Sequence, residues 1–343
     1  MPNARVPFPP MEAQLVTAVP AGEGWQYEPK WDGFRGVLEN EDGELRLWSR
    51  NGRPLLRYFP ELRRLGDALP PHSALDGEIV IESDGRLDFD AMQLRLHPAE
   101  SRIRKLSAET PARYIVFDVL LWRGEALHEL PLRKRRAELL RLVEGFDISP
   151  ASTDVAQART WLAGLETAGL DGIVCKRLDR VYRPGSRDAV VKVKREKTAD
   201  CVIVGYRGSP KHISTLLLGL YRDDGTLDFV GHTSGITASL QKQLQQLLPP
   251  LEEEGHLGEG RSPGGESRWS AGRDLAWTSV RPTIVCEVRF DKIEGDRFRH
   301  GTRFLRFRAD KDPRRCTWDQ VIPPPGPDDF NVERLLGPAA GNG

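Results

Sequence analysis

The stretch Lys30-Trp31-Asp32-Gly33-Phe34-Arg35 is the part of this sequence that most strongly indicates a fold and a chemistry. It sets an amine, an acid and a guanidinium around a glycine. The glycine allows a backbone to come close to a ligand, Asp32 is short enough to orient the amine of Lys30, and Arg35 offers parallel N–H donors to a phosphate. A lysine amine is protonated at neutral pH, so a nucleophilic lysine needs desolvation, nearby cations or a metal. The alternative is a surface lysine in a strand-turn-strand.

Around this stretch, strand-like segments alternate with amphipathic ones as far as about residue 195. Segments with strand-like alternation and flanking turn residues are 25–39, 43–51, 73–82, 112–122, 172–177 and 189–194. Segments with apolar residues at helical spacing are 60–69, 130–145 and 158–169. This pattern predicts mixed antiparallel sheets with helices packed around them.

The pattern changes near residues 195–200, where a charged stretch leads into a region rich in strands. The strands expected there are 215–224, 227–235, 283–293 and 302–311, with a helix over 237–255 and a loop over 258–267. The first two strands join at Asp224-Gly225, a strong hairpin signal. We expect an α+β protein with a domain over residues 1–196, an oligonucleotide-binding (OB-fold) β-barrel over 197–322 and a flexible tail over 323–343.

Composition limits the class of protein. The 343 residues favour two domains, and 39% hydrophobic with 29% charged residues is ordinary for a soluble protein. Lysine and arginine balance aspartate and glutamate at 50 each, so a nucleic-acid site must come from local clustering. The four cysteines form neither a CxxC pair nor a zinc pattern, and neither an apolar leader nor a membrane-spanning run is present. We expect a cytoplasmic protein that does not bind membranes.

Several later motifs also carry residues suited to chemistry. They are Ser49-Arg50-Asn51-Gly52, Leu75-Asp76-Gly77-Glu78, Tyr114-Ile115-Val116-Phe117-Asp118, Asp171-Gly172-Ile173-Val174-Cys175-Lys176, Val190-Val191-Lys192-Val193-Lys194 and Arg308-Ala309-Asp310-Lys311. Lys192 and Lys194 alternate on one predicted strand, so they face the same side, although a solvated edge strand would show the same pattern. Phe117 suits a purine-stacking surface, and it also suits ordinary core packing.

In this order the motifs resemble those of the covalent nucleotidyltransferases, the superfamily of ATP-dependent DNA ligases, RNA ligases and mRNA capping enzymes. The match runs over roughly residues 11 to 320. The wording of the motifs is most similar to the small stand-alone bacterial DNA ligases related to the ligase module of end-joining repair. The resemblance implies that residues 1–196 are an adenylation domain and that the enzyme seals nicks between 3′-hydroxyl and 5′-phosphate ends through a lysyl-AMP intermediate.

The resemblance also implies a role for each matching residue. Lys30, Lys192 and Lys194 would be catalytic. The residues that would bind ATP are Glu28, Arg35, Arg50, Glu78, Phe117, Lys192, Lys194, Arg308 and Lys311. Glu78 and Asp171 would hold Mg²⁺ or Mn²⁺. Asp171 departs from the family, where most ligases have a glutamate, and its shorter reach puts its part as a metal ligand in question.

Two basic strips, 176–197 and 289–315, indicate contact with a phosphate backbone, although a solvated charged face has the same composition. The implied partner is nicked double-stranded DNA, with DNA repair proteins as candidate partners of a nucleoid-associated monomer. Two alternatives stay open. One is an RNA ligase or a GTP-using capping enzyme, and the other is a nucleic-acid-binding protein without catalysis, against which all three predicted catalytic lysines argue.

Overall fold

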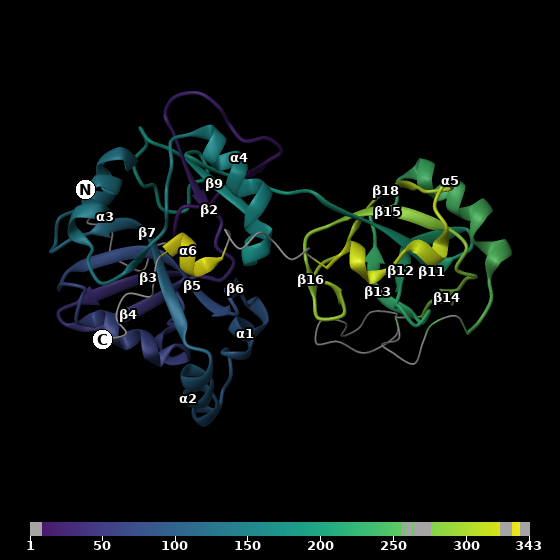
Figure 1. Ribbon diagram of the computed structural model, residues 1–343, viewed down its shortest axis with the longest axis horizontal. Helices are drawn as coiled ribbons and strands as arrows, with labels where there is room; N and C mark the ends of the chain where they lie inside the picture. The colour runs from purple at the N-terminus through teal and green to yellow at the C-terminus, as the bar shows by residue number, and fades with distance from the viewer. Residues whose placement is uncertain (1–8, 256, 258–262, 264–275, 323–330, 337–343) are drawn as a thin grey trace. The chain divides into compact units, whose positions relative to one another are not determined.

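The computed structural model describes residues 9–255, 257, 263, 276–322 and 331–336. The chain divides into two compact units, Met1–Arg195 with Pro324–Gly343, and Glu196–Pro323. Figure 1 shows strands and helices in both units, and each unit has a hydrophobic core of its own.

The first unit contains two sheets. The smaller sheet runs in the order β1 (Gln14–Val16), β10 (Val190–Lys194), β9 (Gly172–Arg177) and β2 (Trp25–Pro29). The larger one runs β4 (Glu44–Ser49), β3 (Phe34–Glu41), β5 (Ser73–Ser83), β7 (Ala112–Leu121) and β8 (Asp147–Ile148), with β6 (Arg86–Leu87) beside β5. Neighbouring strands are antiparallel except for the pairs β1–β10 and β7–β8.

The hexapeptide of residues 30–35 connects the two sheets. The sequence pattern predicts one strand over 25–39, whereas the structure breaks it into β2 and β3, which belong to different sheets. Gly33 lies at the break, where an added Cβ would come within 2.0 Å of the carbonyl oxygen of Ile79. The turn therefore requires a residue without a side chain. The indole N–H of Trp31 donates to the Ser149 hydroxyl at 2.9 Å and anchors the same turn.

The helices of the first unit are α1 (Phe89–Leu94), α2 (Glu100–Glu109), α3 (Leu132–Leu142) and α4 (Val155–Gly164). α3 and α4 lie where helical spacing predicts them, and α1 and α2 lie where the pattern predicts no element. The N-cap of α1 is Asp88, whose side chain accepts a hydrogen bond from the Ala91 amide. The segment Pro60–Gly66 is a 3₁₀ helix.

The second unit is a curved sheet. Its path is β13 (Leu227–Thr233), β12 (His212–Tyr221), β11 (Lys197–Ser209), β15 (Val285–Phe290) and β18 (Arg303–Phe307), and β14 (Thr278–Ser279) pairs with β11. The two ends of this path meet at a parallel bridge between Thr233 and Thr302. Helix α5 (Ala238–Leu247) follows β13, and the hairpin of β16 (Ile293–Glu294) and β17 (Arg297–Phe298) follows β15. We call this second unit, with its sheet ends joined by that bridge, the barrel unit. Together, the mixed sheets and the helices of the two units confirm the predicted α+β class.

Within the segment 323–343, which the sequence predicts to be a flexible tail, residues 332–336 form helix α6 (Val332–Leu336). Val332 is fully buried in the first unit, and its amide donates to the Gly85 carbonyl at 3.0 Å. The predicted loop 258–267 lies, except for residue 263, outside the described residues. Among the helices that the structure describes, none has the length and apolar character needed to cross a membrane.

Candidate functional site

The two sheets of the first unit enclose a cavity of about 540 Å³. One wall comes from β2, β9 and β10, where the strand register sets Glu28, Val174 and Lys192 side by side. The other wall comes from β3, β5 and β7. In the strand register Arg35 of β3 lies opposite Glu78 of β5, and Phe117 lies on the neighbouring strand β7. The predicted site residues that line this cavity are Glu28, Lys30, Arg35, Arg50, Glu78, Phe117 and Lys192.

Asp171 joins two of the predicted catalytic lysines. Its carboxylate oxygens lie 2.8 Å from the Lys30 amine and 2.7 Å from the Lys194 amine. Burial by itself raises the pKa of Asp171, but the two ammonium groups outweigh burial and lower this pKa to about 2. The backbone fixes this geometry, because the Lys30 amide donates to the Gly172 carbonyl at 2.9 Å. The shorter acid therefore reaches both lysines.

Lys192 differs from the other two lysines. It is half-buried on β10, and no carboxylate of the described residues lies within ion-pair distance of its amine. Burial, together with the nearby charges of Lys30 and Lys194, lowers the pKa of Lys192. The charges of Lys30, Lys192 and Lys194 thus act on one another, and Asp171 pairs with two of these lysines.

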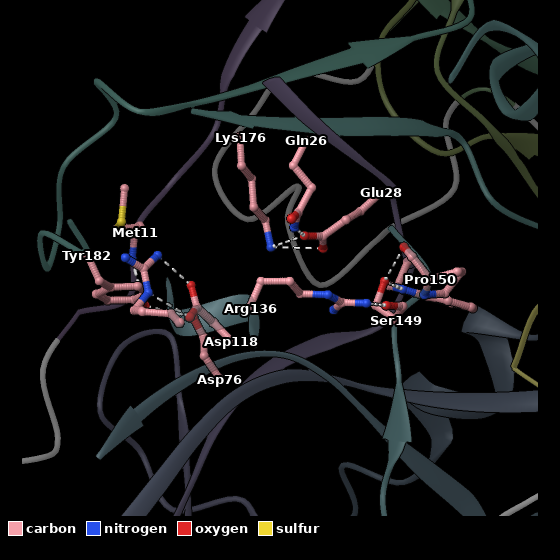
Figure 2. Close-up of polar contacts among 12 residues, drawn as sticks. Met11, Gln26, Glu28, Asp76, Asp118, Arg136, Ser149, Pro150, Lys176 and Tyr182 are labelled. Carbon is pink, nitrogen blue, oxygen red and sulfur yellow. Dashed lines mark hydrogen bonds and ion pairs between the residues drawn. The ribbon is translucent and has the colours of Figure 1, made fainter. Parts of the chain in front are cut away.

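Two cations lie near the ring of Phe117. The Arg35 guanidinium is 4.4 Å from its ring centroid and the Lys176 amine is 4.5 Å away. Lys176 in turn pairs with Glu28 at 2.8 Å, and the Gln26 amide donates to the same carboxylate at 2.8 Å (Figure 2). Glu28 has only 2% of its side chain exposed, so this end of the cavity holds a buried ion pair.

The guanidinium of Arg35 is already engaged. Its Nε and Nη2 donate to the two carboxylate oxygens of Asp76, both at 2.6 Å. The Tyr182 hydroxyl also donates to Asp76 at 2.7 Å and accepts from the Met11 amide at 3.1 Å, which ties the N-terminal segment to the site (Figure 2). Burial opposes the charge of Arg35, but Asp76 overcomes this and raises its pKa. The fork that the sequence assigns to a phosphate therefore faces Asp76.

The remaining predicted residues of this unit lie at the cavity wall. Glu78 is on β5, and burial raises its pKa to about 7 despite the opposing charges of Arg35 and Lys30. Arg50 is exposed in the turn after β4. Among the described residues, no group of three or more His, Cys, Asp or Glu side chains could hold a metal ion. Of the two predicted metal ligands, Glu78 lines the cavity and Asp171 pairs with Lys30, which also lines it.

Arg308 and Lys311 belong to the second unit. The Nη1 of Arg308 donates to Asp200 at 3.0 Å. The Nε and Nη2 of Arg308 donate to the two carboxylate oxygens of Asp310, both at 2.9 Å. The Lys311 amine is 3.2 Å from the same Asp200. Hydrogen bonding to Arg308 lowers the pKa of Asp310 to about 2.

Several residues around the predicted site were not predicted from the sequence. Lys176 is the last residue of the motif that begins at Asp171. Because Val174 and Lys176 are two residues apart on one strand, alternation could have predicted that both side chains face the same side. Asp76 also belongs to a quoted motif. Tyr182 and Asp200 lie in no motif, and their partners are distant in the sequence.

The comparisons with known proteins agree with the motifs. The family model described as ATP dependent DNA ligase domain matches residues 10–194, and that described as ATP dependent DNA ligase C terminal region matches residues 209–311. DNA ligase C1 of Mycolicibacterium smegmatis is 43% identical over 342 residues, which cover 95% of this chain and 97% of the relative. The multifunctional non-homologous end joining protein LigD of Pseudomonas aeruginosa is 34% identical over 338 residues, covering 94% of this chain and 38% of that protein.

Among solved structures, one of the Lig E DNA ligases aligns with a TM-score of 0.53 at 16% identity, covering 87% of this chain and 100% of that chain. This likeness supports the fold alone. The first family model spans more than half of this chain, and the similarity to DNA ligase C1 extends over nearly its whole length. The resemblance read from the motifs is confirmed, and the chain belongs to the family of ATP-dependent DNA ligases.

Proposed function

We propose that this chain seals nicks in double-stranded DNA and that Lys30 carries the AMP. The observation that supports this most directly is the position of the Lys30 amine. It lies in the cavity, paired with Asp171 at 2.8 Å, with the Lys194 amine on the other oxygen of the same carboxylate. A lysine held beside other amines in a partly desolvated site meets the conditions for a nucleophilic amine.

The first step forms a bond between the Lys30 nitrogen and the α-phosphorus of ATP. The bond from that phosphorus to the bridging oxygen breaks, and pyrophosphate leaves with the electron pair. The proton of the attacking amine leaves to solvent, while Asp171 orients the nitrogen. Lys192 and Lys194 neutralise the charge that develops on the α-phosphate, and Phe117 stacks on the adenine.

An oxygen of the 5′-phosphate at a nick then attacks the phosphorus of the AMP, and the bond from that phosphorus to the Lys30 nitrogen breaks, which frees the lysine amine. In the last step, the neighbouring 3′-hydroxyl attacks that phosphate and AMP leaves. Binding and positioning of the two DNA ends supply most of the rate in both steps. The basic residues on β18, Arg303 and Arg306, are exposed or half-exposed and suit a phosphate backbone.

The two carboxylates at the cavity fit a divalent cation that arrives with ATP. Mg²⁺ in nucleotide sites is usually held by one or two carboxylates together with substrate phosphates, so a cluster of three acids is not required. Glu78 is the better placed of the two, because both oxygens of Asp171 already face ammonium groups. Bound there, the cation would offset phosphate charge.

The barrel unit takes part in the first step. By the resemblance, Arg308 and Lys311 orient the pyrophosphate as it leaves. A Lys311→Ala protein should form lysyl-AMP more slowly than wild type. Equal rates for the two proteins would contradict this part of the proposal.

The central experiment offers the purified full chain labelled ATP or GTP with Mg²⁺ and locates the adduct by mass spectrometry. We expect AMP on Lys30, no GMP adduct, and loss of the adduct in Lys30→Ala but not in Lys134→Ala, which alters an exposed lysine of α3. The adenylated protein is then given nicked DNA and nicked RNA side by side. Adduct formation with GTP would favour a capping enzyme, preferred sealing of RNA would favour an RNA ligase, and absence of any adduct would favour a non-catalytic binding protein.

The setting of the reaction is also a proposal. Similarity to a protein named for non-homologous end joining suggests a role in DNA repair, with repair proteins as partners. A monomer in the bacterial cytoplasm, associated with the nucleoid, agrees with this role. Light scattering of the purified chain, alone and with nicked DNA, tests the oligomeric state.

A further inference from the structure

Asp200 is a buried carboxylate in the barrel unit that receives both cations of the Arg308–Lys311 motif. It lies on β11, and its side chain is 11% exposed. Its two oxygens accept from Arg308 Nη1 at 3.0 and 3.2 Å, and Lys311 Nζ lies 3.2 Å away. One acid thus fixes the relative positions of two cations that are three residues apart on an irregular segment after β18.

The backbone around Asp200 is held from two sides. The Asp200 amide donates to the Gln320 side-chain oxygen at 3.0 Å, and the Gln320 side-chain nitrogen donates back to the Asp200 carbonyl at 3.3 Å. The Arg308 amide is anchored in turn, since it donates to the Val285 carbonyl at 2.8 Å. Carboxylate and guanidinium therefore both project from fixed backbone.

Asp310 provides the contrast. It also pairs with Arg308, through two hydrogen bonds of 2.9 Å, but its side chain is 69% exposed. Phosphate oxygens can replace an exposed carboxylate at little cost, because water already solvates it. Replacing a buried carboxylate leaves a desolvated charge without a partner, which is far more costly. A phosphate that binds Arg308 will therefore displace Asp310 and leave Asp200 in place.

We propose that Asp200 is a positioning residue that orients Arg308 and Lys311 toward the pyrophosphate of ATP during adenylation of Lys30. This inference rests on the proposed function. Asp200 acts through the two cations and does not contact the nucleotide. Its effect should therefore be confined to the step in which pyrophosphate leaves, and it should be absent once AMP is on the DNA.

The experiment separates these steps in the full-length protein. Single-turnover formation of lysyl-AMP is measured over a range of Mg·ATP concentrations for wild type and Asp200→Asn. The sealing of a nick that already carries AMP on its 5′-phosphate is measured separately. We expect the maximal adenylation rate of Asp200→Asn to fall about tenfold or more, because the two cations lose the charge that orients them. Sealing of the pre-adenylated nick should change less than about twofold, because no pyrophosphate leaves in that step.

The matched control is Asp228→Asn. Asp228 is as buried as Asp200, at 9% exposure for each residue, and it pairs with Arg222 and Trp318 in the same unit. We expect both steps to stay near wild type. A double variant of Asp200→Asn with Lys311→Ala should lose little more than the more damaging single change, because both act through one arrangement.

The outcomes are distinguishable. A wild-type protein without an adduct on Lys30 overturns the proposed function itself. With that adduct present, an Asp200→Asn protein that adenylates at the wild-type rate overturns the inference. An equal loss in adenylation and in sealing of the pre-adenylated nick, or fully additive losses in the double variant, overturns it as well, since each would indicate a general structural role.

Discussion

Asparagine at position 171 tests whether one carboxylate holds the amines of Lys30 and Lys194. Burial raises the pKa of Asp171, and the two ammonium groups more than reverse this, so the pKa falls from 3.8 to about 2. That difference corresponds to a contribution of about 2 kcal/mol to the free energy of unfolding at neutral pH. Because the folded pKa is the lower one, this contribution is complete above about pH 5 and is lost as the pH falls through about 4 to 2. Asp171→Asn should therefore be about 2 kcal/mol less stable than wild type at pH 7, and the difference should shrink to roughly half near pH 3.

The assay is urea unfolding of the full chain at pH 7 and pH 3, followed by pulsed hydrogen exchange in peptides from β9 and β10, so that the first unit is observed by itself. Asp188→Asn is the control, because Asp188 is exposed in the same unit and its change should cost less than about 0.5 kcal/mol. An Asp171→Asn protein as stable as wild type at pH 7 would refute the reasoning. So would a loss of stability of the same size at both pH values.

Three other substitutions test the walls of the cavity. Phe117→Ala removes the ring whose centroid lies 4.4 and 4.5 Å from two cations. The KM for ATP in lysyl-AMP formation should rise about tenfold, because stacking and cation–π contacts of about 1 kcal/mol or more are lost. Gly33→Ala puts a Cβ 2.0 Å from a backbone oxygen of β5, whereas the Cβ of the control Gly66→Ala has no neighbour nearer than 3.6 Å. In urea unfolding, the free energy of unfolding should fall by about 3 kcal/mol or more for Gly33→Ala and change little for Gly66→Ala. Lys176→Met leaves Glu28 buried without its cation, and urea unfolding should show a loss of about 3 kcal/mol that adding Glu28→Gln partly restores.

Strand alternation in the sequence predicted part of this site. A period of two sets Lys192 and Lys194 on one face of a strand, and both amines lie on the side where Lys30 lies. Strand alternation could not predict which residue pairs with Arg35. Its guanidinium binds Asp76, 41 residues away, and Asp76 also receives Tyr182, 106 residues further along. Such pairs depend on how two sheets face each other, which local periodicity does not encode.

The same limit explains the elements that were missed. The position of residues 323–343 at the chain terminus predicts a flexible tail, yet Val332 is fully buried and α6 forms where it packs. A helix as short as α6 is not stable by its own propensity, so its tertiary contacts decide. In the segment Pro60–Gly66, helical spacing was correctly recognised, but the chain winds as a 3₁₀ helix. Spacing of three or four residues does not distinguish the two.

The ion pairs divide the nucleotide site into a fixed end and an exchangeable end. Within the described residues, Lys176 is held by Glu28, whose side chain is 2% exposed, whereas Asp171 is 14% exposed and its partners Lys30 and Lys194 are 19% and 26% exposed. Breaking the first pair would strand a buried charge, while phosphate oxygens can compete for the second at moderate cost. We therefore expect ATP to exchange partners at Asp171, which would bring the Lys30 nitrogen next to the α-phosphate, while the Lys176–Glu28 pair beside Phe117 stays in place.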